Sequence, residues 1–283
     1  MVALMNTSVI FTTYNSPAWL EKVLWGFFEQ SVKNFEIVIA DDGSRDDTRE
    51  LIDSLRKESP VPIQHIWQKD DGFQKCRIMN KAILAAKGDY LIFTDGDCIP
   101  RADFVEQHLK HREPKAYLSG GYFKLPMNIS ESITREDVTN QNPFDPGWLV
   151  AQGMKKTHKF MKLTAQGRWA SFLNAVSPTR PTWNGHNASC YKEFALAVNG
   201  FEEKMQYGGQ DCEFGDRLVN FGLKPKRIRY SAVCVHLDHK RGYVTPEMLA
   251  NSRAIREDTK KNGVVKARLG IDQYLSSSSE SGQ

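Results

Sequence analysis

The sequence lacks several features that define common protein classes. No apolar run approaches the roughly 18 residues needed to span a bilayer, and the opening MVALMNTSVIF lacks the basic region and long apolar run of a secretory signal. The five cysteines show no CxxC spacing, which argues against a zinc site or a disulfide framework. Neither H-E-x-x-H nor GxGxxG occurs. We therefore expect a cytoplasmic protein with reduced thiols.

Charge of neither sign dominates the chain. The 38 Lys and Arg residues exceed the 34 Asp and Glu residues by a net charge of +4, which is too small to indicate a nucleic-acid partner. The 283 residues, 40% of them hydrophobic, can bury a large core as one domain or two fused halves. The low-complexity tail SSSSESGQ, residues 276–283, is expected to be disordered.

Strand and helix patterns alternate along the first hundred residues. Strands are predicted at residues 8–13, 35–40, 63–67 and 90–94, with a helix between each pair. This rhythm predicts an α/β fold with a mainly parallel, Rossmann-like sheet covered by helices on both faces. In such sheets ligands bind beyond the carboxyl ends of the strands. The polar sequences TTYN, DDGS and TDGD all fall at those ends.

The second half of the chain is less regular. Residues 126–185 contain several prolines and glycines and the basic segment KKTHKFMKL, and we expect an irregular excursion on the acceptor side. A helix is predicted from Gln210 to Asn220, closed by Gly222. Gly208 and Gly209, just before it, would let another molecule approach the backbone.

Asp211 lies in the first turn of this predicted helix, where the helix dipole stabilises an anion. The residue pattern alone leaves two interpretations open, a structural acid at the helix start and a catalyst. A further helix is predicted to begin near residues 245–246 and to carry the basic sequence RAIREDTKKNG.

Two acidic residues follow the fourth predicted strand directly. Asp95 and Asp97, in TDGDC, can face one ligand because alternate residues of extended backbone point the same way. Such a pair suits Mg²⁺ or Mn²⁺ bound together with substrate phosphates, although a solvated turn would explain it too. His236 and His239, in CVHLDHK, follow another strand-like run and add a credible metal ligand.

Polar residues at two other strand ends could hold a nucleotide. Asp42 can accept hydrogen bonds from a base or ribose, although an Asp-Gly turn explains it as well. Tyr14 offers a stacking ring and Thr12 a polar contact, and here the alternative is a strand leading into a capped helix.

In their order along the chain, these motifs resemble family 2 glycosyltransferases with the GT-A fold. The stretch from SVIFTTYN to TDGDCIP resembles their nucleotide-sugar half. NGHNASCYKEFALAVNGFEEKMQYGGQDCEFGDRL, followed by VCVHLDH, resembles their acceptor half, particularly that of the galactosyltransferase and chondroitin-polymerase type. The resemblance implies a nucleotide-sugar half at residues 1–100, an acceptor-binding and catalytic half at 101–244, and a basic C-terminal helix within 245–275.

The resemblance also implies roles for individual residues. Thr12, Tyr14 and Asp42 would hold the uridine, and Asp95 with Asp97 would form the D-x-D motif. Asp97 is the expected direct metal ligand, completed by His236 and less favourably by His239. Asp211 falls on the catalytic base, and Gly208 with Gly209 on the loop that meets the acceptor.

The chain departs from the family pattern at two positions. Gln210 stands where the motif usually has glutamate before the base. Gln74 stands where related sequences often carry arginine, which leaves Lys75 or Arg77 to bind the diphosphate. The Q-x-x-R-W signature of processive synthases does not follow Asp211, so a single-addition enzyme is expected.

The implied activity is an inverting transfer of a hexose from a UDP-sugar to a hydroxyl of a saccharide acceptor, with Mn²⁺ or Mg²⁺ as cofactor. A bacterial lipopolysaccharide or surface polysaccharide is the expected product. The basic segment KKTHKFMK and the C-terminal helix favour an anionic acceptor or a lipid-linked glycan at the inner face of the cytoplasmic membrane, and an ordinary solvated surface explains them equally.

Two other functions are compatible with a nucleotide-binding α/β half. A sugar-phosphate nucleotidyltransferase would carry a Gly-rich loop with Arg and Lys near the N-terminus, which TTYNSPAWL does not provide. A catalytically silent nucleotide-sugar-binding protein would account for Gln210 but not for the retained acids and histidine.

Overall fold

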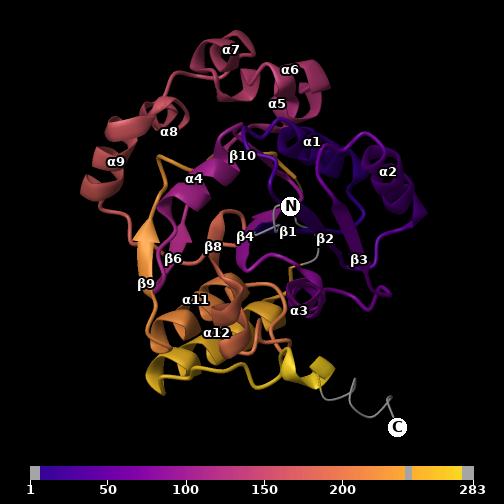
Figure 1. The fold of residues 1–283 in the computed structure, drawn as a ribbon, viewed down its shortest axis with the longest axis vertical. Coiled ribbons are helices and arrows are strands. Elements are labelled where there is room, and N and C mark those ends of the chain that lie inside the picture. Colours follow the sequence, from indigo (N-terminus) through magenta and orange to yellow (C-terminus); the bar gives the residue numbers. More distant parts are fainter. Residues whose placement is uncertain (1–6, 240–243, 276–283) are drawn as a thin grey trace, which may run out of the picture.

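A seven-stranded sheet forms the centre of the computed structural model, which describes residues 7–239 and 244–275 (Figure 1). The strand order is β3-β2-β1-β4-β8-β6-β9. The strands are β1 (Thr7–Thr13), β2 (Glu36–Asp41), β3 (Ile63–Trp67), β4 (Tyr90–Asp95), β6 (Ala116–Ser119), β8 (Ala188–Tyr191) and β9 (Lys224–Arg227). β1 to β4 are parallel, and β8 is antiparallel to both of its neighbours. The predicted mainly parallel α/β sheet is confirmed.

A second, three-stranded sheet has the order β5-β10-β7, formed by β5 (Cys98–Pro100), β10 (Val233–His236) and β7 (Gly121–Lys124). β4 belongs to the first sheet and β5 to the second, so the chain crosses between the two sheets at residues 96–97. β10 is antiparallel to β5, with His236 opposite Cys98. The end of β10 therefore meets the turn that follows β4.

Helices cover both faces of the central sheet, as the alternation of side chains requires. Along β1, Val9 and Phe11 pack with α1 (Pro17–Phe28), α2 (Asp46–Arg56) and α4 (Phe104–His111), whereas Ile10 packs with α3 (Lys75–Ala85), α10 (Lys192–Ala197) and α11 (Gln210–Asn220). The apolar face of α1 is buried, namely Leu20, Val23, Leu24, Phe27 and Phe28.

The excursion between residues 126 and 185 is more helical than predicted. It holds α5 (Met127–Ser132), α6 (Arg135–Thr139), α7 (Pro146–Ala151), α8 (Met161–Thr164) and α9 (Gly167–Val176), with short 3-10 turns at Asn142–Phe144 and His158–Phe160. Side-chain caps start several of them: Thr134 forms a capping box with Asp137, and Asp145 caps the helix that begins at Pro146. The expectation of an irregular segment was wrong because these helices are short and carry little apolar periodicity.

α11 and α12 (Pro246–Lys261) both begin where the sequence predicts. Gly222, in the left-handed region at φ +110°, follows the end of α11, and the Thr245 side chain accepts a hydrogen bond from the Met248 amide at the start of α12. Phe214 and Leu218 of α11 are buried, whereas Phe221, just after the helix, is 43% exposed. The predicted tail, residues 276–283, lies outside the described residues. Within the described ranges, no helix has both the length and the apolar character needed to cross a bilayer.

Candidate active site

The D-x-D acids lie at the junction of the two sheets. The register of β1 with β4 pairs Thr12 with Asp95, and the Thr12 Oγ1 donates to Asp95 Oδ1 over 3.4 Å. The Lys75 ammonium, from the first turn of α3, lies 2.7 Å from the same oxygen. Burial opposes ionisation of Asp95, but the Lys75 charge outweighs it and holds the pKa of that carboxyl below its usual range. The two side chains therefore form an ion pair.

Asp97 faces two imidazoles. Its carboxylate lies 3.6 Å from Nε2 of His236 and 3.0 Å from Nε2 of His239, so the histidine expected to be the weaker candidate is the closer one. The ligand atoms of Asp97, Cys98 and His236 lie within 4.8 Å of one another. Burial and the neighbouring Cys234 raise the pKa of the Cys98 thiol well above its usual range, which favours a neutral thiol there.

This donor set fits a divalent cation. A carboxylate and imidazoles suit Mn²⁺, and a carboxylate with retained waters suits Mg²⁺. The buried Nδ1 of His236 has no hydrogen-bond partner among the described residues. Asp97, His236 and His239 are therefore the residues that could hold the ion.

Asp42 lies directly after β2, and two groups of the loop between β3 and α3 donate hydrogen bonds to it. Its carboxylate accepts hydrogen bonds from Nε2 of Gln68 at 2.6 Å and from the Gln74 amide at 2.9 Å. Burial nevertheless raises the pKa of Asp42 to about 6. Tyr14, at the end of β1, is 49% exposed and donates from its hydroxyl to Asp70, so its ring is available for stacking.

The two candidate diphosphate cations lie in different surroundings. Lys75 is at the D-x-D motif, as described. Arg77 pairs with Asp71 at 3.5 Å and with Glu203 at 3.8 Å. Of the two, Lys75 is the one brought together with the other predicted site residues.

The backbone before Asp211 folds into a tight turn. Gly208 and Gly209 adopt φ of +115° and +96°, which side chains other than glycine rarely tolerate. Oε1 of Gln210 accepts a hydrogen bond from the Gly208 amide at 3.0 Å and closes the turn. A glutamate could accept the same bond, so Gln210 keeps the geometry of the usual motif residue.

The Asp211 carboxylate packs flat against Gly185. A Cβ at position 185 would lie 2.7 Å from both carboxylate oxygens, so the backbone approach requires glycine. Oδ1 of Asp211 is buried and has no hydrogen-bond partner among the described residues. Burial and the charge of Asp95 raise the pKa of Asp211, while the Lys75 ammonium opposes them. A half-buried carboxylate with one buried, unpaired oxygen and a raised pKa has the properties of a general base.

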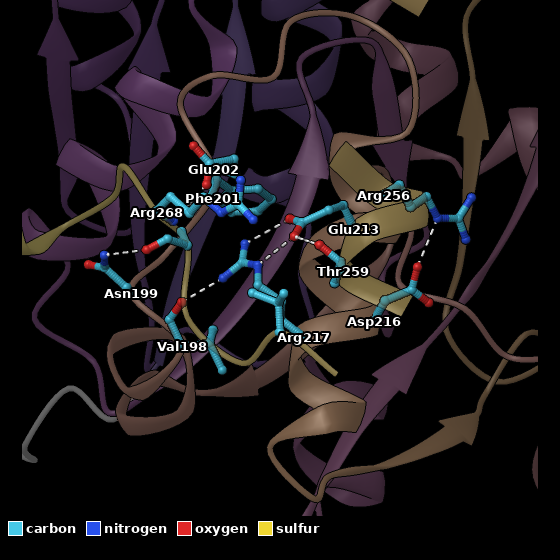
Figure 2. Close-up of polar contacts among 12 residues, drawn as sticks. Val198, Asn199, Phe201, Glu202, Glu213, Asp216, Arg217, Arg256, Thr259 and Arg268 are labelled. Carbon is cyan, nitrogen blue, oxygen red and sulfur yellow. Dashed lines mark hydrogen bonds and ion pairs between the residues drawn. The ribbon is translucent and has the colours of Figure 1, made fainter. Parts of the chain in front are cut away.

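A buried ion pair fixes α11 in place (Figure 2). Arg217 makes a two-pronged contact with Glu213, at 2.8 and 3.0 Å, and donates to the Val198 carbonyl at the end of α10. Thr259 of α12 donates to the same Glu213 carboxylate at 2.9 Å. The helix that carries Asp211 is thereby bonded to elements on two sides.

His186 also lies in this site, although the sequence analysis did not single it out. The antiparallel register of β8 with β4 pairs Ala188 with Phe93, which brings the residues just before β8 beside the end of β4. The His186 ring lies 4.4 Å from the Tyr122 ring, and burial lowers its pKa to about 4. Local spacing gives no signal for this histidine, because a pairing across about ninety residues of chain brings it here.

Comparison with known proteins shows what the chain is similar to. Residues 8–140 match the model of glycosyl transferase family 2. The chain is 27% identical to hyaluronan synthase of Pasteurella multocida over 79% of its length and 25% identical to chondroitin synthase of Escherichia coli over 76%. The first half of the chain is therefore similar to glycosyltransferase family 2. The matches span 24% and 32% of those two synthases, and 60% of a validoxylamine A glucosyltransferase of Streptomyces hygroscopicus that is 25% identical over 88% of the chain.

Solved structures confirm the fold. A mannosyltransferase from Pyrobaculum calidifontis in complex with GDP-Man and Mn²⁺ superposes with a TM-score of 0.57 at 18% identity, covering 97% of this chain and 79% of that one. GalNAc-T7 with UDP, GalNAc and Mn²⁺ gives 0.61 at 14% identity, covering 91% and 48%. The expected GT-A fold is therefore confirmed.

Proposed function

We propose that the chain transfers a hexose from a UDP-sugar to a hydroxyl of a saccharide acceptor, with inversion at the anomeric carbon. The observation that carries this proposal is Asp211: a half-buried carboxylate with one buried, unpaired oxygen, held at the start of α11 near the Lys75–Asp95 pair. Residues 1–100 would bind the donor, and residues 101–244 the acceptor.

In the proposed reaction Asp211 takes the proton of the acceptor hydroxyl as that oxygen attacks C1 of the donor sugar. The new C1–O bond forms on the face opposite the diphosphate, and the bond between C1 and the diphosphate oxygen breaks to release UDP. The raised pKa of Asp211 supports this role, because a carboxylate with a higher pKa is a stronger base. Gly208 and Gly209 would leave room for the acceptor beside it.

The donor would lie across the carboxyl ends of β1, β2 and β4. Asp42 and Thr12 would bind the uridine by hydrogen bonds and Tyr14 by stacking, and the exposure of the Tyr14 ring supports this. Lys75 would face the diphosphate, with Asp95 holding its ammonium in place.

The proposed cofactor is Mn²⁺ or Mg²⁺, held by Asp97 with His236 or His239. When bound, such an ion neutralises charge on the leaving diphosphate. The Mn²⁺ in the two similar solved structures supports a divalent ion.

The proposed acceptor is a saccharide of a bacterial lipopolysaccharide or surface polysaccharide, to which the enzyme would add a single sugar in the cytoplasm. The names of the relatives, hyaluronan and chondroitin synthase, support a polysaccharide acceptor. A cavity of about 440 Å³ beside Asp238, lined also by Lys124, Asn128 and Lys155, could take part of it.

The test is a panel of UDP-sugars scored by UDP release, with and without chondroitin oligosaccharides or lipopolysaccharide core as acceptor. We expect one donor to release UDP faster when an acceptor is present, and Asp211→Asn to remove that increment. Release of pyrophosphate from UTP and a sugar phosphate would instead indicate a nucleotidyltransferase. Donor binding without any UDP release would indicate a silent binding protein.

A further inference from the structure

The segment from residue 146 to residue 180 carries six Lys or Arg residues and no Asp or Glu. The positive charge of this segment alone is larger than the net charge of the whole chain, which is only +4. Lys155, Lys156, Lys159 and Arg168 are exposed. In Figure 1, α8 and α9 of this segment lie along one edge of the molecule. This edge is a local cationic surface.

The helix at this edge presents its apolar side chains to solvent. On α9, Trp169 and Phe172 are each 53% exposed and Val176 is 56% exposed. The Trp169 and Phe172 rings stack on each other at 5.4 Å. Positions 169, 172 and 176 recur at helical spacing, so the three side chains form one strip. We refer to these three residues as the α9 strip.

A polar residue attaches the opposite side of α9 to the protein. The buried Asn174 donates to Ser231 Oγ and accepts from the Tyr230 amide, both at 2.9 Å. Arg227 donates to the Asn174 carbonyl at 2.7 Å. The protein therefore buries the polar Asn174 together with Ala170, and it leaves the three large apolar side chains of the α9 strip exposed, the reverse of the usual amphipathic arrangement.

We propose that the α9 strip and the lysines before it bind the surface of a membrane that contains anionic lipids. The aromatic side chains would enter the headgroup region while the cations contact lipid phosphates. An anionic polysaccharide would also attract the cations and stack on aromatic rings. The aliphatic Val176 in the same strip favours lipid, because it offers no ring for a sugar to stack on.

The surface is also close to the candidate active site. The Lys162 ammonium lies 5.8 Å from the centre of the Tyr122 ring, and that ring contacts His186. The Tyr122 side chain therefore lies between the cationic segment and the candidate active site. An acceptor at the membrane surface would be close to that site. Membrane binding itself does not depend on the proposed transfer reaction.

The test is co-sedimentation of the full chain with vesicles of phosphatidylcholine alone or with 30% phosphatidylglycerol. We expect binding only to the anionic vesicles, weakened by salt. Trp169→Ser with Phe172→Ser should lower the affinity at least tenfold, since each buried aromatic contributes substantially. Replacing Lys155, Lys156 and Lys159 by Glu should lower it further, since each lost cation costs about fivefold.

Matched controls keep the assignment specific. Val219 and Phe221, each 43% exposed on α11 and just after it, are replaced by Ser, and Lys260 and Lys261 at the end of α12 by Glu. Both control variants should bind like the wild type, and circular dichroism should show all variants folded. The proposal is overturned if the control variants lose binding equally. It is also overturned if the chain ignores vesicles but binds soluble chondroitin sulfate through the α9 strip.

Discussion

At the scale of single residues, Asp211 has the most specific environment. It lies in the first turn of α11, yet the residue at the helix N-cap is Gly209 and no side-chain cap is formed there. Its buried Oδ1 is unpaired in the part of the chain that the structure describes. A structural acid would be expected to satisfy both oxygens, so the geometry favours the catalytic role over the structural one.

We predict that Asp211→Asn lowers the rate of transfer roughly 10²–10⁴-fold, the usual contribution of a general base. The amide keeps the shape of the side chain but cannot accept the proton of the acceptor hydroxyl. UDP affinity, measured by calorimetry, should stay close to that of the wild type. If turnover is near normal and only stability falls, by about 0.3–1 kcal/mol, Asp211 merely stabilises the helix start.

Gln210→Glu should leave activity intact or raise it. Oε1 of Gln210 already accepts from the Gly208 amide, and a carboxylate can accept the same bond. Steady-state kinetics of UDP release measure the effect. Loss of activity in this variant would mean that the chain requires the neutral amide.

The raised pKa of Asp42 leads us to predict that nucleotide binding depends on pH. Its pKa of about 6 means that the carboxylate is mostly neutral at pH 5 and ionised at pH 7.5. If the ionised form accepts hydrogen bonds from uridine, UDP affinity should fall about tenfold at pH 5, and Asp42→Asn should remove this part of the dependence. UDP titrates near the same pH, so the difference between wild type and variant is the quantity to measure.

The raised pKa of Asp42 also determines in which direction pH changes the stability of the fold. Because folding raises the pKa of Asp42, the neutral form favours the native state, and this contribution is lost as pH rises through about 6. Asp42→Asn should therefore gain stability relative to wild type between pH 4 and pH 7, as measured by urea unfolding. A constant difference across that range would contradict the raised pKa.

At the scale of elements, the Glu213–Arg217 pair connects α11 to its neighbours. Both side chains are almost fully buried, so removing one partner leaves an uncompensated charge inside the protein. Arg217→Met should destabilise the fold by about 3–5 kcal/mol in urea unfolding. The double variant Arg217→Met with Glu213→Leu should lose less, because neither charge is then buried. An equal loss in both variants would show that shape and not charge is decisive here.

At the scale of the whole molecule, the sequence predicts β1 to β4 of the central sheet, but not β6, β8 and β9, and it predicts the site only in part. β1 to β4 are local apolar runs separated by periodic helices, so each can be recognised without knowing its neighbours. The contacts of Asp97 depend on β10 pairing with β5, which sets His236 opposite Cys98 across more than a hundred residues. Such register cannot be read from local pattern, and the same reason hides His186. The family resemblance supplied the order of the motifs, but not the Lys75–Asp95 ion pair.

Because the candidate site lies at the junction of the two sheets, we predict that ligands bound there stabilise the entire fold. Asp95 ends a strand of one sheet, and His236 ends a strand of the other, so an ion with UDP at this point would connect both. At a ligand concentration about a hundred times the dissociation constant, binding adds about 2.7 kcal/mol to stability. For a chain of this size we expect UDP with Mn²⁺ to raise the melting temperature by about 5–10 °C.

UDP or Mn²⁺ alone should raise the melting temperature less than the two together, and excess EDTA should abolish the additional increase that Mn²⁺ gives. Asp97→Ala is the matched variant: its melting temperature without ligand should stay near that of the wild type, while the increment from Mn²⁺ disappears. Asp97 is partly exposed, and its contacts include the two imidazoles and the Cys98 thiol, so truncation there removes little packing. A full increment in Asp97→Ala would show that the ion, if it binds, is held by other residues.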